Sequence, residues 1–119
     1  MTVNQKALTI TANADSKTYG TAKTYGSGST AYTSSGLVNS ETIGSVTITD
    51  TNSGGVATAA AGGTYNLTPS AAVGTGLSNY SITYATGALT VNQKALTITA
   101  NADSKTYGDV KTYGAGSTA

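Results

Sequence analysis

Alternating apolar and polar residues mark the clearest strands of this chain. Between residues 7 and 13, Leu8, Ile10 and Ala12 alternate with threonine and asparagine. Successive side chains of a strand point to opposite faces, so this pattern predicts a half-buried strand with one apolar face. The same alternation returns between residues 45 and 50, where Val46 and Ile48 are the inward positions. Both stretches predict strands of a β-rich fold.

Two further segments carry weaker strand signals. Residues 31–35 are consistent with a short strand whose inward residue is Tyr32. Residues 64–68 form another predicted strand, and Pro69 follows directly. Because proline has no N–H to donate, we expect Pro69 to end the central pairing of that strand.

Helix is expected in one place only. Residues 36–43 allow a single turn of helix, which Asn39 or Ser40 could cap. The stretches rich in glycine, serine and alanine predict turns, loops or an edge strand; they are residues 13–28, 52–55 and 57–63.

A β-hairpin is predicted near the end of the unit, over residues 80–91. Its two-residue turn would be Thr86-Gly87, which sets Tyr84 opposite Leu89 and places the apolar side chains on one face. Glycine could supply the positive φ that such a turn requires, although threonine is a poorer first residue than asparagine.

The first strand belongs to a long internal repeat. The segment Thr2–Gly20 recurs letter for letter as Thr90–Gly108, an offset of 88 residues (90 − 2). We therefore interpret residues 3–90 as one complete repeat and residues 91–119 as the N-terminal part of the next. A solenoid turn is usually shorter than about 50 residues, so each repeat is expected to fold as a domain of its own.

The seam between consecutive repeats is very short. Only Asn92-Gln93-Lys94 separates the last strand of one repeat from the Leu96–Ala100 strand of the next. A flexible linker would need more residues of glycine and serine character. Successive repeats are therefore expected to join semi-rigidly into an extended tandem array.

Composition and charge narrow the classes of function. The chain has no histidine, cysteine, tryptophan or phenylalanine, and its formal net charge is +1. Within residues 3–90, three lysines balance three acidic residues, so no basic face is available for a nucleic acid. No apolar stretch approaches the roughly 20 residues that cross a bilayer as a helix. Neither nucleic-acid binding nor membrane insertion is expected.

Candidate chemistry is sparse. Without a histidine base, a cysteine nucleophile or closely spaced acids, we predict that the chain is not an enzyme and uses no cofactor. The candidates for calcium are Asn13, Asp15 and Asp103. Calcium takes six to eight oxygen ligands, and one carboxylate per seam falls short of that number. The alternative is that Asn13 and Asp15 bridge a turn through their side chains, so no dedicated metal site is predicted.

The tyrosines are the only aromatic residues. A row of exposed tyrosines could stack on sugars, which makes a surface glycan the candidate ligand. The alternative is that most of them belong to the core, each with its hydroxyl bonded to a partner near the surface. The threonine and serine rows need no ligand, since these residues favour strands and tolerate water.

The order of several short motifs resembles a known family. These motifs are Leu8–Ala12, Ser16–Gly20, Ser35–Thr42, Gly63–Tyr65, Asn79–Tyr84 and Gly87–Val91. Together they resemble the MBG repeat of the Tyr-Gly-X type, which occurs in very large bacterial surface proteins, including filamentous-haemagglutinin-like exoproteins. The resemblance covers residues 3–90. The chain departs from it at Thr21, where the second copy has the more usual acidic residue, Asp109.

The resemblance implies a secreted or surface-anchored, mostly-β module without catalytic residues. We expect an all-β fold, a small immunoglobulin-like β-sandwich repeated in a tandem array; the alternative is a β-grasp-like sheet with one short helix. The predicted function is a structural stalk or spacer of a bacterial adhesin or extracellular filament. The alternative function is a glycan- or receptor-binding adhesion module.

The repeat also suggests self-assembly. Leu8 and Ile10 in the first copy, and Leu96 and Ile98 in the second, offer the same strand twice. The partners expected are neighbouring copies of the repeat, in the same chain or joined head to tail. An unpaired tail would fray, so we expect residues 92–119 to be packed, either in a filament or as the start of the next domain.

Overall fold

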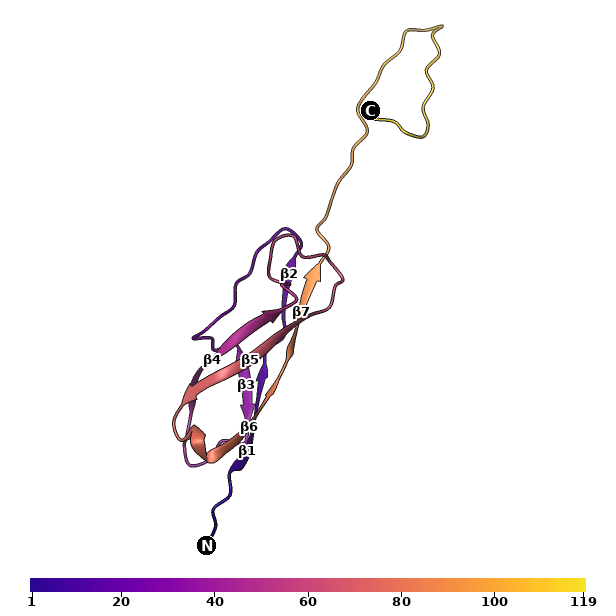
Figure 1. Cartoon of the computed structure of the whole chain (residues 1–119). Helices are drawn as coiled ribbons and strands as arrows, with labels where there is room; N and C mark the ends of the chain where they lie inside the picture. Colours follow the sequence, from indigo (N-terminus) through magenta and orange to yellow (C-terminus); the bar gives the residue numbers. More distant parts are fainter.

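The computed structural model describes residues 1–119 and consists of β-strands and loops (Figure 1). Its strands are β1 (Lys6–Ala12), β2 (Asp15–Thr18), β3 (Tyr32–Ser35), β4 (Ile43–Thr51), β5 (Tyr65–Gly74), β6 (Tyr80–Ala85) and β7 (Gly87–Asn92). One 3₁₀ turn, η1 (Leu77–Asn79), precedes β6. No helix has the length and apolar character to cross a membrane. The predicted all-β class is confirmed.

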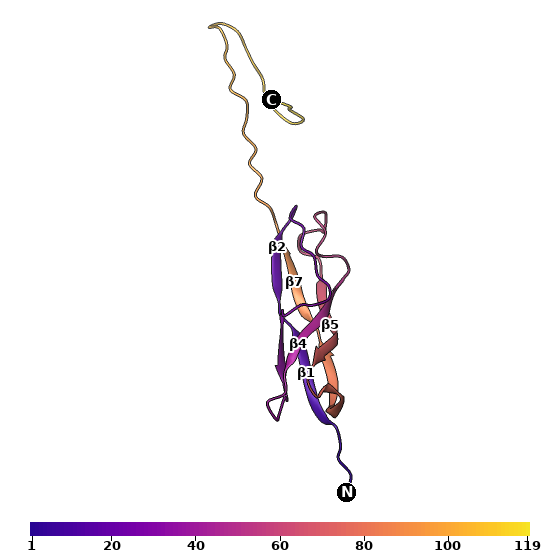
Figure 2. The same ribbon diagram turned by 90° about the vertical axis from the view of Figure 1, so that its left-hand side faces the viewer.

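The strands form two sheets that share one core (Figure 2). The three-stranded sheet has the order β3-β1-β6, and the four-stranded sheet has the order β2-β7-β5-β4. Both sheets contribute to one cluster of buried side chains, which are Leu8, Ile10, Ala12, Val46, Ile48, Leu67, Tyr80 and Leu89. The likeness to an immunoglobulin sandwich stays a prediction.

The two strands with the clearest alternation, β1 and β4, line opposite sides of this core. In β1, Leu8, Ile10 and Ala12 are at most 2% exposed, while the threonines between them face outward. In β4, Val46 and Ile48 are buried on the opposite side of the core. The alternation predicted these orientations correctly because each strand is covered on one face only.

The predicted hairpin at Thr86-Gly87 is wrong. β6 and β7 follow each other closely along the chain but lie in different sheets. β6 pairs in parallel with β1, and β7 pairs in parallel with β2. β1 and β2 thus run beside β6 and β7 in the same direction. The segments β1–β2 and β6–β7 both cross from the three-stranded sheet to the four-stranded sheet, and they do so at the same level.

Gly87 is needed at this crossing because the two backbones come very close. A Cβ atom on Gly87 would lie 2.4 Å from the carbonyl oxygen of Ala12 and 2.8 Å from that of Asn13. The φ of Gly87 is not positive, in contrast to the hairpin prediction. The alternation could not distinguish the two arrangements, since both place Leu89 and Val91 on the core side. Parallel pairing with β6 and antiparallel pairing with β3 give β1 a hydrogen-bonded neighbour on each side.

The predicted helical turn in residues 36–43 is also wrong. Asn39 and Ser40 have φ values of 57° and 58°, so they form a left-handed turn instead of a cap. Gly36 packs so closely on β1 that a Cβ would lie 2.5 Å from the carbonyl oxygen of Ala7. Asparagine and glycine accept such conformations readily. A β-grasp-like sheet with a helix at this point does not form.

Pro69 does not end its strand, because β5 continues to Gly74. The pairing of β5 with β7 stops at Leu67, however, and from Pro69 onward the strand is paired with β4 alone. The expected loss of central pairing at Pro69 is therefore confirmed. The predicted strand at residues 31–35 is confirmed as well, and residues 57–63 form a loop, one of the two alternatives, and not an edge strand.

Residues 93–119 contain no strand and are exposed throughout. They extend away from the folded body, which gives the chain extents of 101 × 19 × 17 Å (Figure 1). The expectation that this segment begins a packed next domain is wrong, and its packing in a filament stays a prediction. Its residues repeat those of β1 and β2 but pair with no strand of the folded body. The division into residues 3–90 and 91–119 stays a prediction.

Candidate functional site

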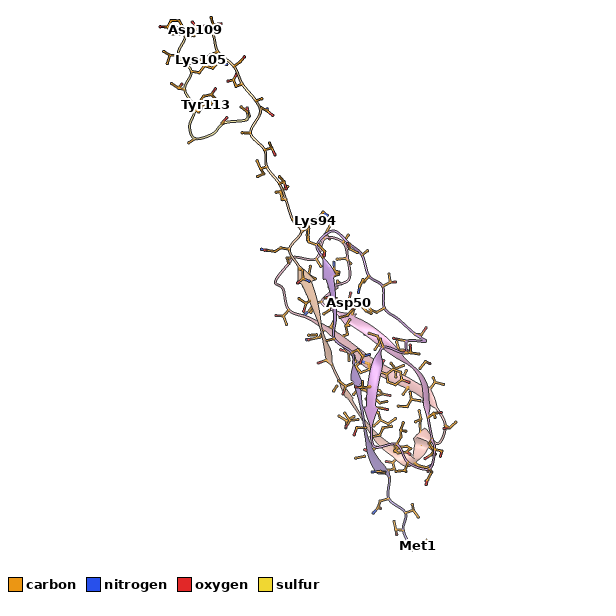
Figure 3. The ribbon with its side chains drawn as sticks, turned by 180° about the vertical axis from the view of Figure 1, so that it is seen from behind. Met1, Asp50, Lys94, Lys105, Asp109 and Tyr113 are labelled. Atoms are coloured by element: carbon orange, nitrogen blue, oxygen red, sulfur yellow. The ribbon has the colours of Figure 1, made fainter.

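The two poles of the folded body are the first feature with a bearing on function. We call the end where β1 begins, at Lys6, the N-terminal pole, and the end where β7 stops, at Asn92, the C-terminal pole. Met1 and Lys94 lie at opposite ends of the body (Figure 3). Because β1–β2 and β6–β7 run in the same direction, the chain enters at one pole and leaves at the other.

The Tyr-Gly motif closes the C-terminal pole. The backbone N–H of Tyr19 donates to the carbonyl oxygen of Asn92 at 2.8 Å, and that of Gly20 donates to Ala57 at 3.1 Å. Gly20 has a φ of 94°, which favours glycine at this turn. The motif therefore attaches the end of β2 both to the last strand and to the loop that follows β4.

Lys17 is a structural residue of this pole that the sequence pattern did not reveal. Its side chain is buried, and the ammonium donates to the carbonyl oxygens of Thr21 at 2.9 Å and of Val56 at 2.6 Å. A buried charge needs such partners. The one signal available was the position of Lys17 at an inward place of β2, directly before the Tyr-Gly turn.

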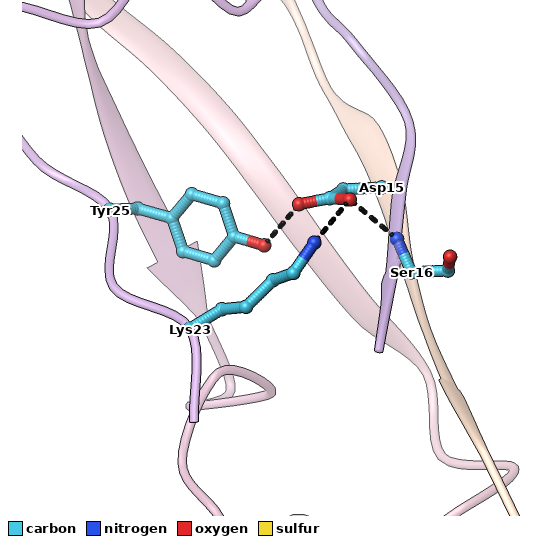
Figure 4. Close-up of polar contacts among 4 residues, drawn as sticks. All are labelled: Asp15, Ser16, Lys23 and Tyr25. Atoms are coloured by element: carbon cyan, nitrogen blue, oxygen red, sulfur yellow. Dashed lines mark hydrogen bonds and ion pairs between the residues drawn. The ribbon is translucent and has the colours of Figure 1, made fainter. Parts of the chain in front are cut away.

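A polar cluster lies beside the crossing of the strands (Figure 4). The carboxylate of Asp15 accepts hydrogen bonds at 2.8 Å from the ammonium of Lys23, the hydroxyl of Tyr25 and the backbone N–H of Ser16. The hydrogen bond from Lys23 holds the pKa of Asp15 below its usual value. Burial, and then the bond to Asp15, raise the pKa of the Tyr25 hydroxyl. Both shifts favour an ionised Asp15 beside a protonated Tyr25.

The second copy makes the same cluster without a folded domain around it. Asp103 accepts hydrogen bonds from Lys111, from the hydroxyl of Tyr113 and from the N–H of Ser104. The spacings along the chain equal those of the first copy. The cluster is therefore a local property of this sequence, and the repeated spacing is a signal that could have revealed it.

The structure does not assemble the three calcium candidates. Asp15 and Asp103 each carry a lysine ammonium, which occupies the place where a cation would approach. The backbone N–H of Asn13 donates to Ala31, and Asp103 belongs to the exposed segment. No group of three or more histidine, cysteine, aspartate or glutamate residues comes together anywhere in the chain. Asp15 bridges Ser16, Lys23 and Tyr25 through its carboxylate, as the alternative interpretation predicted, whereas Asn13 is held by its backbone N–H and not by its side chain.

The tyrosines of the repeat do not form an exposed platform. Four of them bond through the hydroxyl to the backbone of the body; they are Tyr32, Tyr65, Tyr80 and Tyr84. The Tyr25 hydroxyl donates to Asp15, and Tyr19 alone exceeds two fifths exposure within the folded body. Tyr80 belongs to the buried core, and Tyr25, Tyr32, Tyr65 and Tyr84 are partly buried against it with bonded hydroxyls, as the core interpretation predicted.

The structure separates the four predicted assembly residues. Leu8 and Ile10 are 1% and 0% exposed, whereas Leu96 and Ile98 are 83% and 87% exposed. The same sequence is thus a central strand in one place and an unpaired segment in the other. Tertiary partners, and not local propensity, decide which state it adopts.

Two sheets around one core, closed by a Tyr-Gly turn, define a small all-β module. A family model described as the MBG domain (YGX type) matches residues 8–90. The chain belongs to the family of MBG domains of the YGX type. No curated protein and no solved structure matches it. The family suggests an adhesin-like repeat of surface proteins.

Proposed function

We propose that this repeat is a structural spacer, which joins end to end with its neighbours to form the stalk of a secreted or surface-anchored bacterial adhesin or extracellular filament. The observation that carries the proposal is the position of the two chain ends at opposite poles. Each repeat then adds its full length to the array. A domain whose ends lay side by side would instead fold the array back on itself.

The seam residues support a stiff connection. At the C-terminal pole, the carbonyl oxygen of Asn92 accepts the hydrogen bond from Tyr19. At the N-terminal pole, the side-chain amide of Gln5 donates to the carbonyl oxygen of Ser78 at 3.0 Å. Gln93 is the copy of Gln5. In an array, Asn92 would therefore be held by the preceding repeat, and Gln93, the next residue, would be held by the following repeat.

The length of one repeat follows from the strand register. Lys6 lies beside Tyr80, and Lys94 is the copy of Lys6. One repeat therefore advances by the nearly straight run from Tyr80 to Lys94. At about 3.3 Å per residue, this run measures about 45 Å.

Small-angle X-ray scattering on chains of one, two and three complete repeats tests the proposal. The maximum dimension should grow by about 45 Å with each repeat. A growth that follows the square root of the repeat number would show freely jointed domains, and the stalk proposal would then be wrong. A chain with several glycine and serine residues inserted after Gln93 is the flexible control.

No catalysis is part of this proposal. The chain has no histidine or cysteine, and the two carboxylates of the polar clusters are neutralised by lysines. The adhesion-module alternative requires an exposed binding face, and no observation favours it over the stalk. Glycan-array binding by a chain of two complete repeats would support that alternative.

A further inference from the structure

We propose that each seam of the array is closed at a second point, where the Tyr19-Gly20 turn of one repeat abuts the η1 turn of the next repeat in the same chain. The partner surface of the Tyr-Gly turn is thus the N-terminal pole of the following repeat. This inference rests on the proposed spacer function and deepens it, because it names the contact that keeps the stalk straight.

The strand register places the Tyr-Gly turn beside one particular residue of the seam. At the C-terminal pole, Thr18 of β2 pairs with Asn92 of β7. The next residue of β2 is Tyr19, whose backbone N–H donates to the carbonyl oxygen of Asn92. Tyr19 therefore lies at the level of Gln93, the residue that follows Asn92.

The η1 turn reaches the same level from the other repeat. At the N-terminal pole, Lys6 of β1 pairs with Tyr80 of β6. The residue before Tyr80 is Asn79, the last residue of η1, so it lies at the level of Gln5. Gln93 is the copy of Gln5. Tyr19 of one repeat and Asn79 of the next therefore flank the same seam residue.

Both turns also lie on the same side of the seam. The carbonyl oxygen of Asn92 points towards the end of β2, and alternate residues of a straight strand direct their backbone groups to the same side, so Lys94 points there too. Asn13, directly after β1, bonds towards the β3 side through Ala31, so the even residue Lys6 points towards β6. Because Lys94 is the copy of Lys6, β6 of the next repeat lies on the same side as β2.

The burial of the side chains agrees with this arrangement. Val91 faces the core of its own repeat, and Leu8, whose copy is Leu96, faces the core of its repeat. Residues 91 and 96 are an odd number of positions apart, so a straight strand directs them to opposite faces. Consecutive repeats are therefore related by about a half-turn around the stalk axis, and this rotation sets β6 of the next repeat in line with β2.

The array thus contains two parallel lines of strands. At each seam, one line is continuous through Gln93, and the other is interrupted between β2 and the next β6. Neighbouring strands lie about 4.8 Å apart, so the ends of β2 and β6 cannot both continue at this level and must turn away. Gly20, with a φ of 94°, and η1 make these turns. Their surfaces meet end to end and give the seam its second support.

The surfaces of the two turns suit such a contact. Tyr19 is 43% exposed, and its hydroxyl makes no hydrogen bond, unlike the hydroxyls of the other tyrosines of the folded body. η1 contains no charged and no buried residue. Ser78 and Asn79 line a hollow of about 440 Å³ together with the seam residues Gln5 and Lys6. A half-exposed tyrosine with a free hydroxyl, facing such a hollow, is typical of an interface.

Distances between spin labels on a chain of two complete repeats test the proposal. The chain consists of residues 1–93 followed by a second copy of residues 6–92. Each copy closes its own core, because the buried cluster lies within residues 8–89. The sequence has no cysteine, so Thr49→Cys in both copies places one label at an exposed position of each. The distribution of distances should be narrow, because two points fix the seam.

The same substitution at two places separates the contact from an effect on the domain. Tyr19→Ser in the first repeat removes the side chain at the seam and should broaden the distribution. Tyr19→Ser in the second repeat, which no repeat follows in this chain, should leave it narrow. Asn79→Glu should broaden the distribution in the second repeat and leave it narrow in the first. The two seam substitutions together should broaden it no more than either alone, because they remove one contact.

Two results would overturn the proposal. One is an equal distribution for Tyr19→Ser in the first and in the second repeat. The other is a broad distribution in the chain without these substitutions. The scattering experiment on one, two and three repeats decides the spacer function separately. If the length grows by about 45 Å per repeat while both placements of Tyr19→Ser give equal distributions, the spacer function stands and the second contact fails.

Discussion

Substitution of Gly87 by alanine tests the parallel crossing of the strands most directly. The new Cβ would lie 2.4 Å and 2.8 Å from two backbone carbonyl oxygens, those of Ala12 and Asn13. Contacts below 3.0 Å force the backbone to shift, and neither oxygen belongs to a flexible side chain. Inserting a group into a closely packed site costs about 1–3 kcal/mol, and two backbone contacts place Gly87→Ala near 3 kcal/mol. That is a large part of the roughly 5–10 kcal/mol expected for such a domain.

Urea unfolding measures this loss. With a slope of about 1.5 kcal/mol per molar urea, the midpoint should fall by roughly 2 M. Gly26→Ala is the matched control, because a Cβ there meets nothing within 4 Å, and it should change the free energy of unfolding by less than about 0.5 kcal/mol. Gly87→Asn distinguishes the structure from a hairpin. A turn with positive φ would accept asparagine, whereas the crossing should not. If Gly87→Asn unfolds at the same urea concentration as the unchanged chain, the reasoning is refuted.

Three further predictions use the same assay. Ile10→Ala should lower the free energy of unfolding by about 2–5 kcal/mol, while Ile98→Ala, the same change in the exposed copy, should leave it unaltered; equal effects would contradict the core assignment. Lys17→Met should cost about 1–3 kcal/mol because two buried backbone carbonyls lose their donor; an unchanged midpoint would show that water replaces the ammonium. The pKa of Asp15 is held down by Lys23, so its stabilisation is present above about pH 4 and is lost as the pH falls through the lowered pKa. Asp15→Asn should flatten this acid dependence slightly, since the ion pair is partly exposed; an unaltered acid slope would contradict this.

The sequence predicted best those strands that are covered on one face. Leu8 and Ile10, like Val46 and Ile48, alternate with polar residues, and the structure buries them as predicted. This prediction works because, in a strand with one buried face, every second side chain points into the core. The family and the all-β class could also be predicted, because both depend on motifs of neighbouring residues.

What could not be predicted depends on contacts between distant segments. The alternation around Gly87 allows a hairpin or a straight run, and the pairing with residues more than seventy positions earlier selects the straight run. The turn at Asn39 and Ser40 resembled a helix cap because these residues favour both caps and left-handed turns. The role of Lys17 depends on the carbonyl of Val56, 39 residues away. No local pattern contains such information.

The parallel course of the first and last strands has a mechanical consequence. When the two ends of the repeat are pulled apart, tension acts along β1–β2 and β6–β7 in opposite senses. Six paired positions between β1 and β6, and four between β2 and β7, would then be loaded in shear. They must break together, whereas a hairpin loaded at its open end unzips one pair at a time. A chain of such units would therefore resist being drawn out by flowing liquid.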